Sequence, residues 1–297
     1  MNLTKTQKIA KTSALAIGVG FLTIAATVAK GEILTGLTFN LGGGSGQLVF
    51  FDSATPETWS SAPVAISGAG GEAFVGIDYI GTTLYGVSAA GKIYTINTTT
   101  GIATQAGGGS FGTLTGTYFG VDATLVSGNP RVRIIGAGVG GINDLVNGQN
   151  GNLVSADPSI TGRFISGIST RSDTVLFGVD TLSDQLYVLN ATTGGSTLVG
   201  SFGNDMSGKN GFDISPNTGI AYLGCGAGSS ALAANLWTVD LSTGAVTSQG
   251  SGSVGFTSTG ENILLYGLTV AAVPEPGTTA LFVLGGAGML ALIRRRK

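Results

Sequence analysis

Lys92-Ile-Tyr-Thr-Ile-Asn97-Thr-Thr-Thr-Gly101-Ile-Ala-Thr-Gln-Ala-Gly107 contains the structural unit of this chain. A short run of aromatic and β-branched residues leads into an Asn, three Thr and a Gly, and a second short run follows. The Asn side chain can bond the backbone of its own turn, and the Gly supplies a positive φ. The stretch therefore predicts a β-strand, a tight turn and a second β-strand.

The same template occurs twice more, at Asn190-Ala-Thr-Thr-Gly194 and at Asp240-Leu-Ser-Thr-Gly244. A second element lies upstream of these turns and consists of Gly, an apolar residue and Asp, followed by another short strand. Its copies are Gly76-Ile-Asp78, Gly120-Val-Asp122, Gly178-Val-Asp180 and Gly211-Phe-Asp213. Together the two elements give four strands per unit of about 40 residues, which is typical of β-propeller blades.

Four blades are predicted near residues 74–107, 118–155, 163–200 and 211–250. The near copies Leu265-Tyr-Gly-Leu-Thr269 and Leu34-Thr-Gly-Leu-Thr38 lie at opposite ends of the body. They predict a fifth blade built from both ends, which would close the ring and leave no exposed sheet edge. We therefore expect an all-β propeller of five four-stranded blades over residues 30–272. Six blades, or a β-sandwich or solenoid, are the alternatives.

Gly71-Glu-Ala-Phe-Val-Gly-Ile-Asp78 and Leu236-Trp-Thr-Val-Asp-Leu-Ser-Thr-Gly244, with the other Gly-apolar-Asp copies, resemble a bacterial propeller-like family of domains of unknown function. The resemblance covers most of the body and departs from the pattern around residues 126–157. It implies a fold and brings no activity with it.

Both ends of the chain carry targeting features. Residues 1–29 begin with Lys5, Lys8 and Lys11 and continue as an apolar run that ends in small residues. This composition predicts a signal helix handled by the export translocon and signal peptidase, with cleavage after Ala29. An uncleaved anchor is the alternative.

The other end has three parts: residues 273–277, an uncharged run at 278–293 and a basic tail at 294–297. As a helix, the run would span roughly 24 Å, which is short of the ~30 Å hydrocarbon core. The flanking basic side chains, Arg294, Arg295, Arg296 and Lys297, can extend its reach and place the tail in the cytoplasm. We expect a minimal transmembrane helix with the body outside the cytoplasm.

Val273, Pro274, Glu275 and Pro276 precede this run, and the two prolines favour an extended, exposed segment. The motif, the short helix and the terminal Arg cluster resemble the PEP-CTERM sorting signal of Gram-negative bacteria. The resemblance implies recognition and removal of the tail by an exosortase, and an association with exopolysaccharide and biofilm matrix. An ordinary tail anchor with a Pro-rich stem is the alternative.

The charge balance limits the classes of partner that the protein can bind. All 16 acidic residues lie between Glu32 and Glu275, and 7 of the 14 basic residues belong to the signal and the tail, so the exported part carries 7 − 16 = −9 charges. An acidic surface repels phosphate backbones, so we expect no nucleic-acid partner. The chain has no His and a single Cys, Cys225, which excludes an internal disulfide, His-based catalytic triads and a zinc site of His and Cys. Cys225 is expected to be a buried apolar residue.

Carboxylates are the remaining side chains that could carry out catalysis or bind a metal ion. Asp78, Asp122, Asp180 and Asp213 recur once per predicted blade and could converge at one rim, where paired acids could hydrolyse a glycosidic bond or oxygens could hold Ca²⁺. The favoured interpretation is that each Asp caps its own turn, so we expect no metal and no cofactor. Trp59, Tyr94, Tyr187 and Trp237 could stack on sugars, although a place in the blade core is favoured.

The glycines Gly136, Gly138 and Gly141 match the dinucleotide-binding pattern, but Asn-Gly turns follow where that site needs a helix. We therefore interpret them as a blade turn. The sequence favours an exported, non-enzymatic binding or structural protein of the cell envelope or matrix. The alternative is a carboxylate-based glycan hydrolase built on the propeller.

Overall fold

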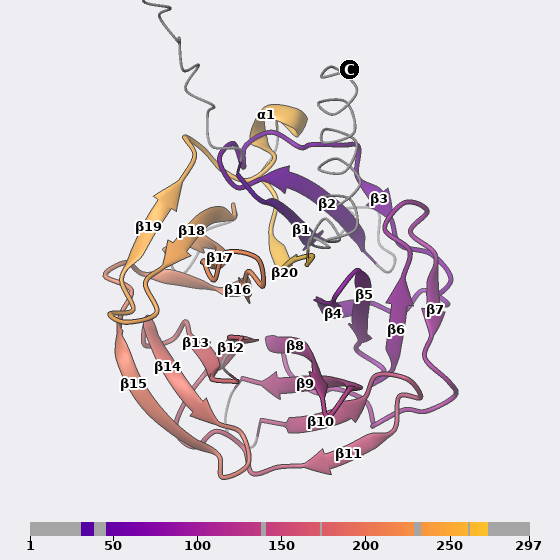
Figure 1. Cartoon of the computed structure of the whole chain (residues 1–297). Helices are drawn as coiled ribbons and strands as arrows, with labels where there is room; N and C mark the ends of the chain where they lie inside the picture. Colours follow the sequence, from indigo (N-terminus) through magenta and orange to yellow (C-terminus); the bar gives the residue numbers. More distant parts are fainter. Residues whose placement is uncertain are drawn as a thin grey trace, which may run out of the picture. The chain divides into compact units, whose positions relative to one another are not determined.

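The computed structural model describes residues 31–38, 46–137, 141–172, 174–228, 233–260 and 262–272. Within these ranges the chain is all-β apart from one short helix, α1 (Phe256–Thr259). The strands form five sheets of four antiparallel strands each, arranged as blades around a central axis (Figure 1). The predicted five-bladed propeller is thereby confirmed.

Four blades are continuous in sequence, and in each of them the first strand lies nearest the axis. The first of these blades consists of β4 (Phe74–Ile80), β5 (Thr83–Ser88), β6 (Ile93–Ile96) and β7 (Ala103–Gln105). The second consists of β8 (Phe119–Val126), β9 (Asn129–Gly136), β10 (Asn143–Asn147) and β11 (Leu153–Ala156). The third consists of β12 (Ile165–Thr170), β13 (Leu176–Asp180), β14 (Gln185–Asn190) and β15 (Gly195–Ser201). The fourth consists of β16 (Met206–Ile214), β17 (Ala221–Ala227), β18 (Asn235–Val239) and β19 (Val246–Gln249).

The fifth blade joins the two ends of the body, as the near-identical end sequences predict. Its innermost strand, β20 (Leu265–Val270), pairs with β1 (Ile33–Thr38), which is followed outward by β2 (Gln47–Asp52) and β3 (Val64–Ala65). Leu34 lies opposite Val270 in the register. This pairing completes a four-stranded blade from the two ends of the body and so closes the ring.

Each inner strand carries a glycine where it meets the next blade. These glycines are Gly76, Gly120, Gly167, Gly211 and Gly267, and the apolar residue of the following blade packs over each of them. A Cβ on Gly76 would lie 2.4 Å from the Val121 side chain, and one on Gly211 would lie 2.2 Å from the Leu268 backbone nitrogen. Only glycine allows adjacent inner strands to approach this closely.

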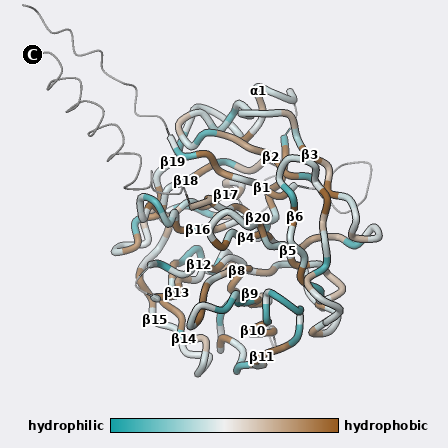
Figure 2. Tube along the Cα trace, turned by 45° about the vertical axis from the view of Figure 1, so that its right-hand side comes forward, coloured by the Kyte–Doolittle hydropathy of each residue, from teal (hydrophilic) through white to brown (hydrophobic). Residues whose placement is uncertain are grey.

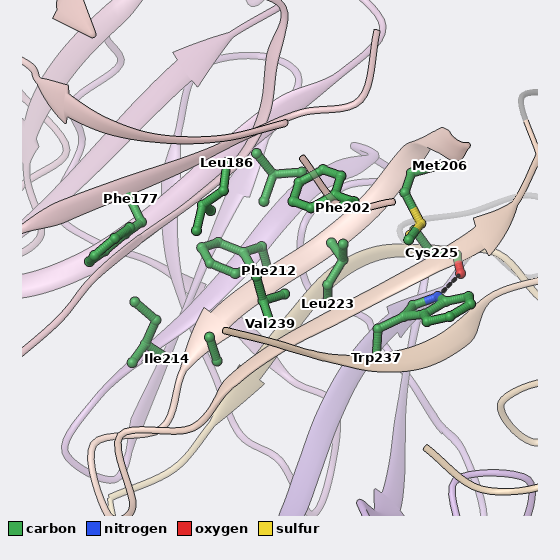
Figure 3. Close-up of a cluster of buried hydrophobic side chains, with 12 residues drawn as sticks. Phe177, Leu186, Phe202, Met206, Phe212, Ile214, Leu223, Cys225, Trp237 and Val239 are labelled. Atoms are coloured by element: carbon green, nitrogen blue, oxygen red, sulfur yellow. Dashed lines mark hydrogen bonds between the residues drawn. The ribbon is translucent and has the colours of Figure 1, made fainter. Parts of the chain in front are cut away.

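The hydrophobic core is divided among the joints between blades. The described residues form five buried clusters, one at each joint. In the cluster between the third and fourth blades, Phe177 and Leu186 pack near Phe212 and Leu223, and the Trp237 indole donates a hydrogen bond to the Cys225 carbonyl (Figure 3). Figure 2 correspondingly shows hydrophobic stretches distributed around the whole ring.

The turns between the outer strands have the predicted chemistry. The Asn97 carboxamide oxygen accepts from the Thr99 and Thr100 amides at 2.9 and 3.0 Å, and Gly101 has a φ of 73°. In the other two copies Asn190 accepts from the Thr193 amide and Asp240 from the Ser242 amide, and the turn glycines again have a positive φ. A fourth copy, which the sequence analysis interpreted only as Asn-Gly turns, runs from Asn147 to Gly151.

The expected signal helix (1–29), sorting motif (273–277), transmembrane helix (278–293) and basic tail (294–297) lie outside the described residues. Within the ranges given above, no helix is long and apolar enough to cross a membrane.

The contacts of the inner-strand glycines predict that an alanine at one of these positions destabilises the fold. Gly211→Ala places a Cβ against backbone, so the free energy of unfolding should fall by about 1–3 kcal/mol or more. Gly108→Ala is the matched control, because a Cβ there has no atom within 4 Å and the φ is not positive. Denaturant unfolding followed by circular dichroism measures both, and equal stability of the two variants would contradict the packing described here.

Candidate functional site

The residue two positions after each inner-strand glycine forms a buried polar belt. Its members are Asp78, Asp122, Ser169, Asp213 and Thr269, and each has at most 7% of its surface exposed. Because side chains alternate along a strand, each of these residues points toward the same neighbouring blade as its glycine. We call this set the inter-blade belt.

The belt forms a hydrogen bond across every joint of the ring. Asp78 accepts from the Ala123 amide at 2.5 Å, and Asp122 accepts from the Thr170 amide and hydroxyl, both at 2.7 Å. The Ser169 hydroxyl donates to Asp213 at 2.8 Å and accepts from the Ile214 amide at 3.0 Å. Asp213 accepts from the Val270 amide at 2.7 Å, and the Thr269 hydroxyl closes the circle by donating to Asp78 at 2.6 Å.

The belt also forms the floor of a cavity at one end of the central axis. This cavity, the funnel, has a volume of about 390 Å³ and is lined by the three belt carboxylates together with backbone and hydroxyl groups of the turns around it. Thr124, Leu125 and Thr170 also line a groove of about 1000 Å³ between the second and third blades. The funnel therefore continues into a longer depression on the same face.

The three carboxyl groups have perturbed acidities. Burial raises the pKa of Asp213 from its ordinary 3.8 to about 7, and the nearby charge of Asp122 adds to the effect. Burial, followed by the charges of Asp213 and Asp122, raises the pKa of Asp78 well above its ordinary value. Burial also raises the pKa of Asp122. The cause is shared, because three acids lie in one enclosed place that disfavours their charged forms.

The structure corrects the assignment of Asp180. It lies on β13, the second strand of its blade, and accepts from the Leu182 and Ser183 amides of its own turn at 3.0 Å. Own-turn capping therefore holds for Asp180, but it does not describe the other three, whose carboxylates bridge to the next blade. The misassignment arose because Gly-apolar-Asp also fits a second strand, where Gly178 packs against Leu189.

Sequence reasoning missed two members of the belt, Ser169 and Thr269, because they lack the carboxylate that was used as the marker. The spacing of the belt positions along the sequence could have identified Ser169 and Thr269. The positions 78, 122, 169, 213 and 269 are separated by 44, 47, 44 and 56 residues, which is more even than the separations obtained with Asp180. A glycine two positions earlier also marks both residues.

The belt geometry constrains the possible chemistry. Each of the six carboxylate oxygens of Asp78, Asp122 and Asp213 already accepts at least one hydrogen bond from the protein. No group of His, Cys, Asp or Glu in the described part of the chain has an arrangement suited to a metal ion. The three carboxylates therefore serve first as acceptors that hold blades together.

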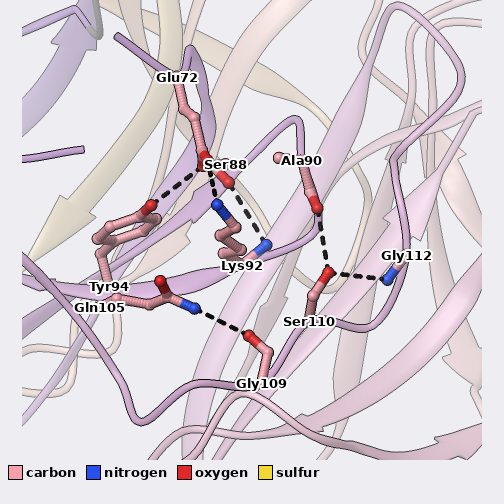
Figure 4. Close-up of polar contacts among 9 residues, drawn as sticks. All are labelled: Glu72, Ser88, Ala90, Lys92, Tyr94, Gln105, Gly109, Ser110 and Gly112. Carbon is pink, nitrogen blue, oxygen red and sulfur yellow. Dashed lines mark hydrogen bonds and ion pairs between the residues drawn. The ribbon is translucent and has the colours of Figure 1, made fainter. Parts of the chain in front are cut away.

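The opposite end of the axis is narrower. A cavity of about 100 Å³ lies there between Tyr118, Tyr266, Lys209 and Asn210, and the passage from it to the funnel has room for about one water molecule. The same face carries a polar cluster on the first blade, in which Glu72 pairs with Lys92 and accepts from the Tyr94 hydroxyl at 3.0 Å (Figure 4).

The other sequence candidates occupy structural positions. Tyr94, Tyr187 and Trp237 are buried in the clusters at the joints between blades, and Trp59 packs against the cluster between the fourth and fifth blades. Cys225 is fully buried, and burial raises the pKa of its thiol. Gly136 lies at the end of β9, as expected for a blade turn. Val273, Pro274, Glu275, Pro276 and the four basic residues Arg294 to Lys297 lie outside the described residues.

Two known families match parts of this chain. Residues 47–260, well over half of the chain, match the domain of unknown function DUF4394. The chain belongs to this family. Residues 272–297 match the PEP-CTERM protein-sorting motif, which implies export and membrane-anchored processing by an exosortase. The match to the sorting motif begins two residues after β20, the last strand of the propeller.

Similar solved structures include a protein of unknown function from Bacteroides caccae, with 11% identity over 74% of this chain and 73% of that one, at a TM-score of 0.42. A nidogen/laminin complex has 10% identity over 81% of this chain and 98% of the other, also at 0.42. No curated protein gave a significant match.

The raised pKa values predict a pH dependence of stability. A carboxyl whose pKa is higher in the folded than in the unfolded chain stabilises the fold below the unfolded pKa, and this contribution is lost as the pH rises through the folded pKa. For Asp213 the window runs from about 4 to about 7, and the free energy of unfolding should fall there by roughly 1.4 kcal/mol per pH unit per proton.

Denaturant unfolding at a series of pH values between about 5 and 8 tests this expectation. Asp213→Asn should weaken the dependence, and the raised pKa values of Asp78 and Asp122 should leave a residual fall. Asp240→Asn should leave it unchanged, because this Asp lies on an exposed turn and its pKa is lowered by the hydroxyl and amide of Ser242. Stability that rises with pH across this range, or a control that flattens equally, would refute the buried-acid interpretation.

Proposed function

We propose that this chain is an exported, non-enzymatic binding module of the cell envelope or extracellular matrix. An exosortase releases it from a C-terminal membrane anchor, residues 278–293, and its ligand is exopolysaccharide. The observation that carries the proposal is the position of the sorting motif, which follows the last propeller strand almost directly. A chain with this arrangement delivers a folded propeller to the outer side of a membrane.

The shape and chemistry of the funnel face support a polymeric, hydroxyl-rich ligand. The funnel and the groove between the second and third blades share lining residues, so together they could hold several units of a linear chain. Their walls present hydroxyl and amide groups, for example Thr124, Ser127, Asn190, Thr193 and Thr197. Such groups exchange hydrogen bonds with sugar hydroxyls, and water can mediate further contacts.

The inter-blade belt supports a role without catalysis. A general acid or nucleophile must reach the reacting atoms with its carboxyl oxygen. In the belt these oxygens accept from neighbouring backbone and hydroxyl groups, and moving one of them outward would break a joint of the ring.

Sorting can be tested by replacing Pro274, Glu275 and Pro276 together with Ala in the producing bacterium. The variant should retain its tail and stay with the membrane, because the protease loses the residues that resemble its recognition motif. Immunoblots of membrane and culture fractions measure this, and replacement by Ala of Thr98, Thr99 and Thr100, of which Thr99 and Thr100 are exposed and Thr98 is half-buried, is the control. Unchanged release of the processed protein would rule out the sorting proposal.

One observation favours the alternative, a glycan hydrolase: three carboxyl groups with raised pKa values line an open cavity. Incubating the protein with a panel of bacterial polysaccharides separates the two functions. The binding module should retain a polysaccharide in affinity electrophoresis and release no reducing ends. Release of reducing ends that is abolished by Asp78→Asn, while the fold is retained, would establish the hydrolase and refute the non-enzymatic function.

A further inference from the structure

The two ends of the body leave the propeller on the same face, and this is the funnel face. Inner strands run toward the funnel, so β20 ends there at Val270, which itself lines the cavity. Two hydrogen bonds then fix the last described residues at the rim. The Asn217 side chain donates to the Ala271 carbonyl at 3.0 Å, and the Ala272 amide donates to the Gly81 carbonyl at 3.2 Å.

The beginning of the body is fixed to the same rim. Glu32 accepts from the hydroxyls of Ser215, Thr218 and Tyr222, at 2.6, 2.7 and 3.1 Å. Ser215 and Gly81 both line the funnel. The turn that holds Glu32 therefore also holds Ala271, and the point of exit is a built part of the rim.

Chain length determines which face can meet the membrane. Five residues, 273–277, lie between Ala272 and Thr278, where the expected membrane run begins, so the two ends of this segment are at most about 20 Å apart when it is fully extended. The inner strand β8 has 8 residues and is about 26 Å long. A connection that starts at the funnel rim is thus too short to pass along the side of the propeller and bring the opposite face to the bilayer.

The surface chemistry of the rim is also suited to contact with a bilayer. Exposed apolar side chains at the strand ends and turns around the funnel include Leu125 and Val126 on the second blade, Ile220 on the fourth and Ile33 on the fifth, with exposed fractions of 41–56%. Scattered apolar side chains among hydroxyl groups are compatible with the headgroup region of a bilayer.

We propose that the funnel face is the membrane-facing surface of the anchored protein, so that the bilayer covers the funnel until the tail is removed. This inference rests on the proposed anchoring and sorting. It adds the orientation of the propeller relative to the membrane, and this orientation controls access to the funnel. Polysaccharide reaches the funnel freely only after release, which restricts binding to the matrix side of the envelope.

Cysteine labelling tests the orientation, because the native Cys225 is fully buried and should give little background. Leu125→Cys and Ile220→Cys place a thiol on the funnel rim. Leu182→Cys is the matched control: Leu182 is 78% exposed on the turn between β13 and β14, at the opposite face. Each full-length variant is reconstituted into phosphatidylethanolamine–phosphatidylglycerol vesicles without the protease and treated with a maleimide coupled to polyethylene glycol.

A second series carries an inserted Gly-Ser linker of about ten residues between Ala272 and Val273, which adds roughly 18 Å of average reach. The rim thiols should label several-fold more slowly in the short series than in the linker series, and Leu182→Cys should label equally in both. Circular dichroism confirms that each variant is folded, and the two rim positions guard against a local defect at either one.

The outcomes separate this inference from the function on which it rests. If the chain floats with the vesicles but rim and control thiols respond alike to the linker, the orientation is wrong and the anchoring stands. If the chain does not float with the vesicles, the proposed anchor fails, and the orientation fails with it.

Discussion

The close approach of five inner strands around one axis is the constraint on which the rest of this structure depends. A strand can lie this near its neighbour only where it has no side chain, and the glycines at positions 76, 120, 167, 211 and 267 meet that condition at every joint. The apolar residue that follows each glycine then packs over the glycine of the preceding blade. The contact is cyclic, so every blade supports the next and the fifth returns to the first.

The inter-blade belt follows from the same geometry. Two residues beyond each glycine, the side chain again faces the neighbouring blade, where backbone amides need acceptors as the strands diverge. Asp, Ser and Thr provide these acceptors, and three of the five are carboxylates. Crowding three acids in one buried place opposes ionisation, so the arrangement that joins the blades also gives the funnel floor its unusual acidity.

The pairing that builds the fifth blade also determines where the sorting motif leaves the propeller. Because β20 pairs with β1, both ends of the body must leave from the strand ends at the funnel face. The sorting motif matched at residues 272–297 therefore begins at the rim of the main cavity. Closure of the ring and the position of the sorting motif at the funnel rim are both consequences of this pairing.

The sequence by itself determined the approximate limits of four blades, the chemistry of the outer turns and the closure by both ends, and it favoured five blades over six. These features depend on local patterns, since Asn or Asp, Thr and Gly at fixed offsets specify a turn wherever they occur. The sorting motif at residues 272–297 was equally visible, because it is a linear motif.

Only the tertiary structure decided the members and the role of the belt. Gly178-Val-Asp180 has the same local pattern as Gly76-Ile-Asp78, yet it lies one strand further out, and Gly167-Ile-Ser169 takes the equivalent place. Whether an Asp caps its own turn or bridges to the next blade depends on contacts between residues about 45 positions apart. Such contacts arise from packing around the axis, which local sequence patterns do not encode.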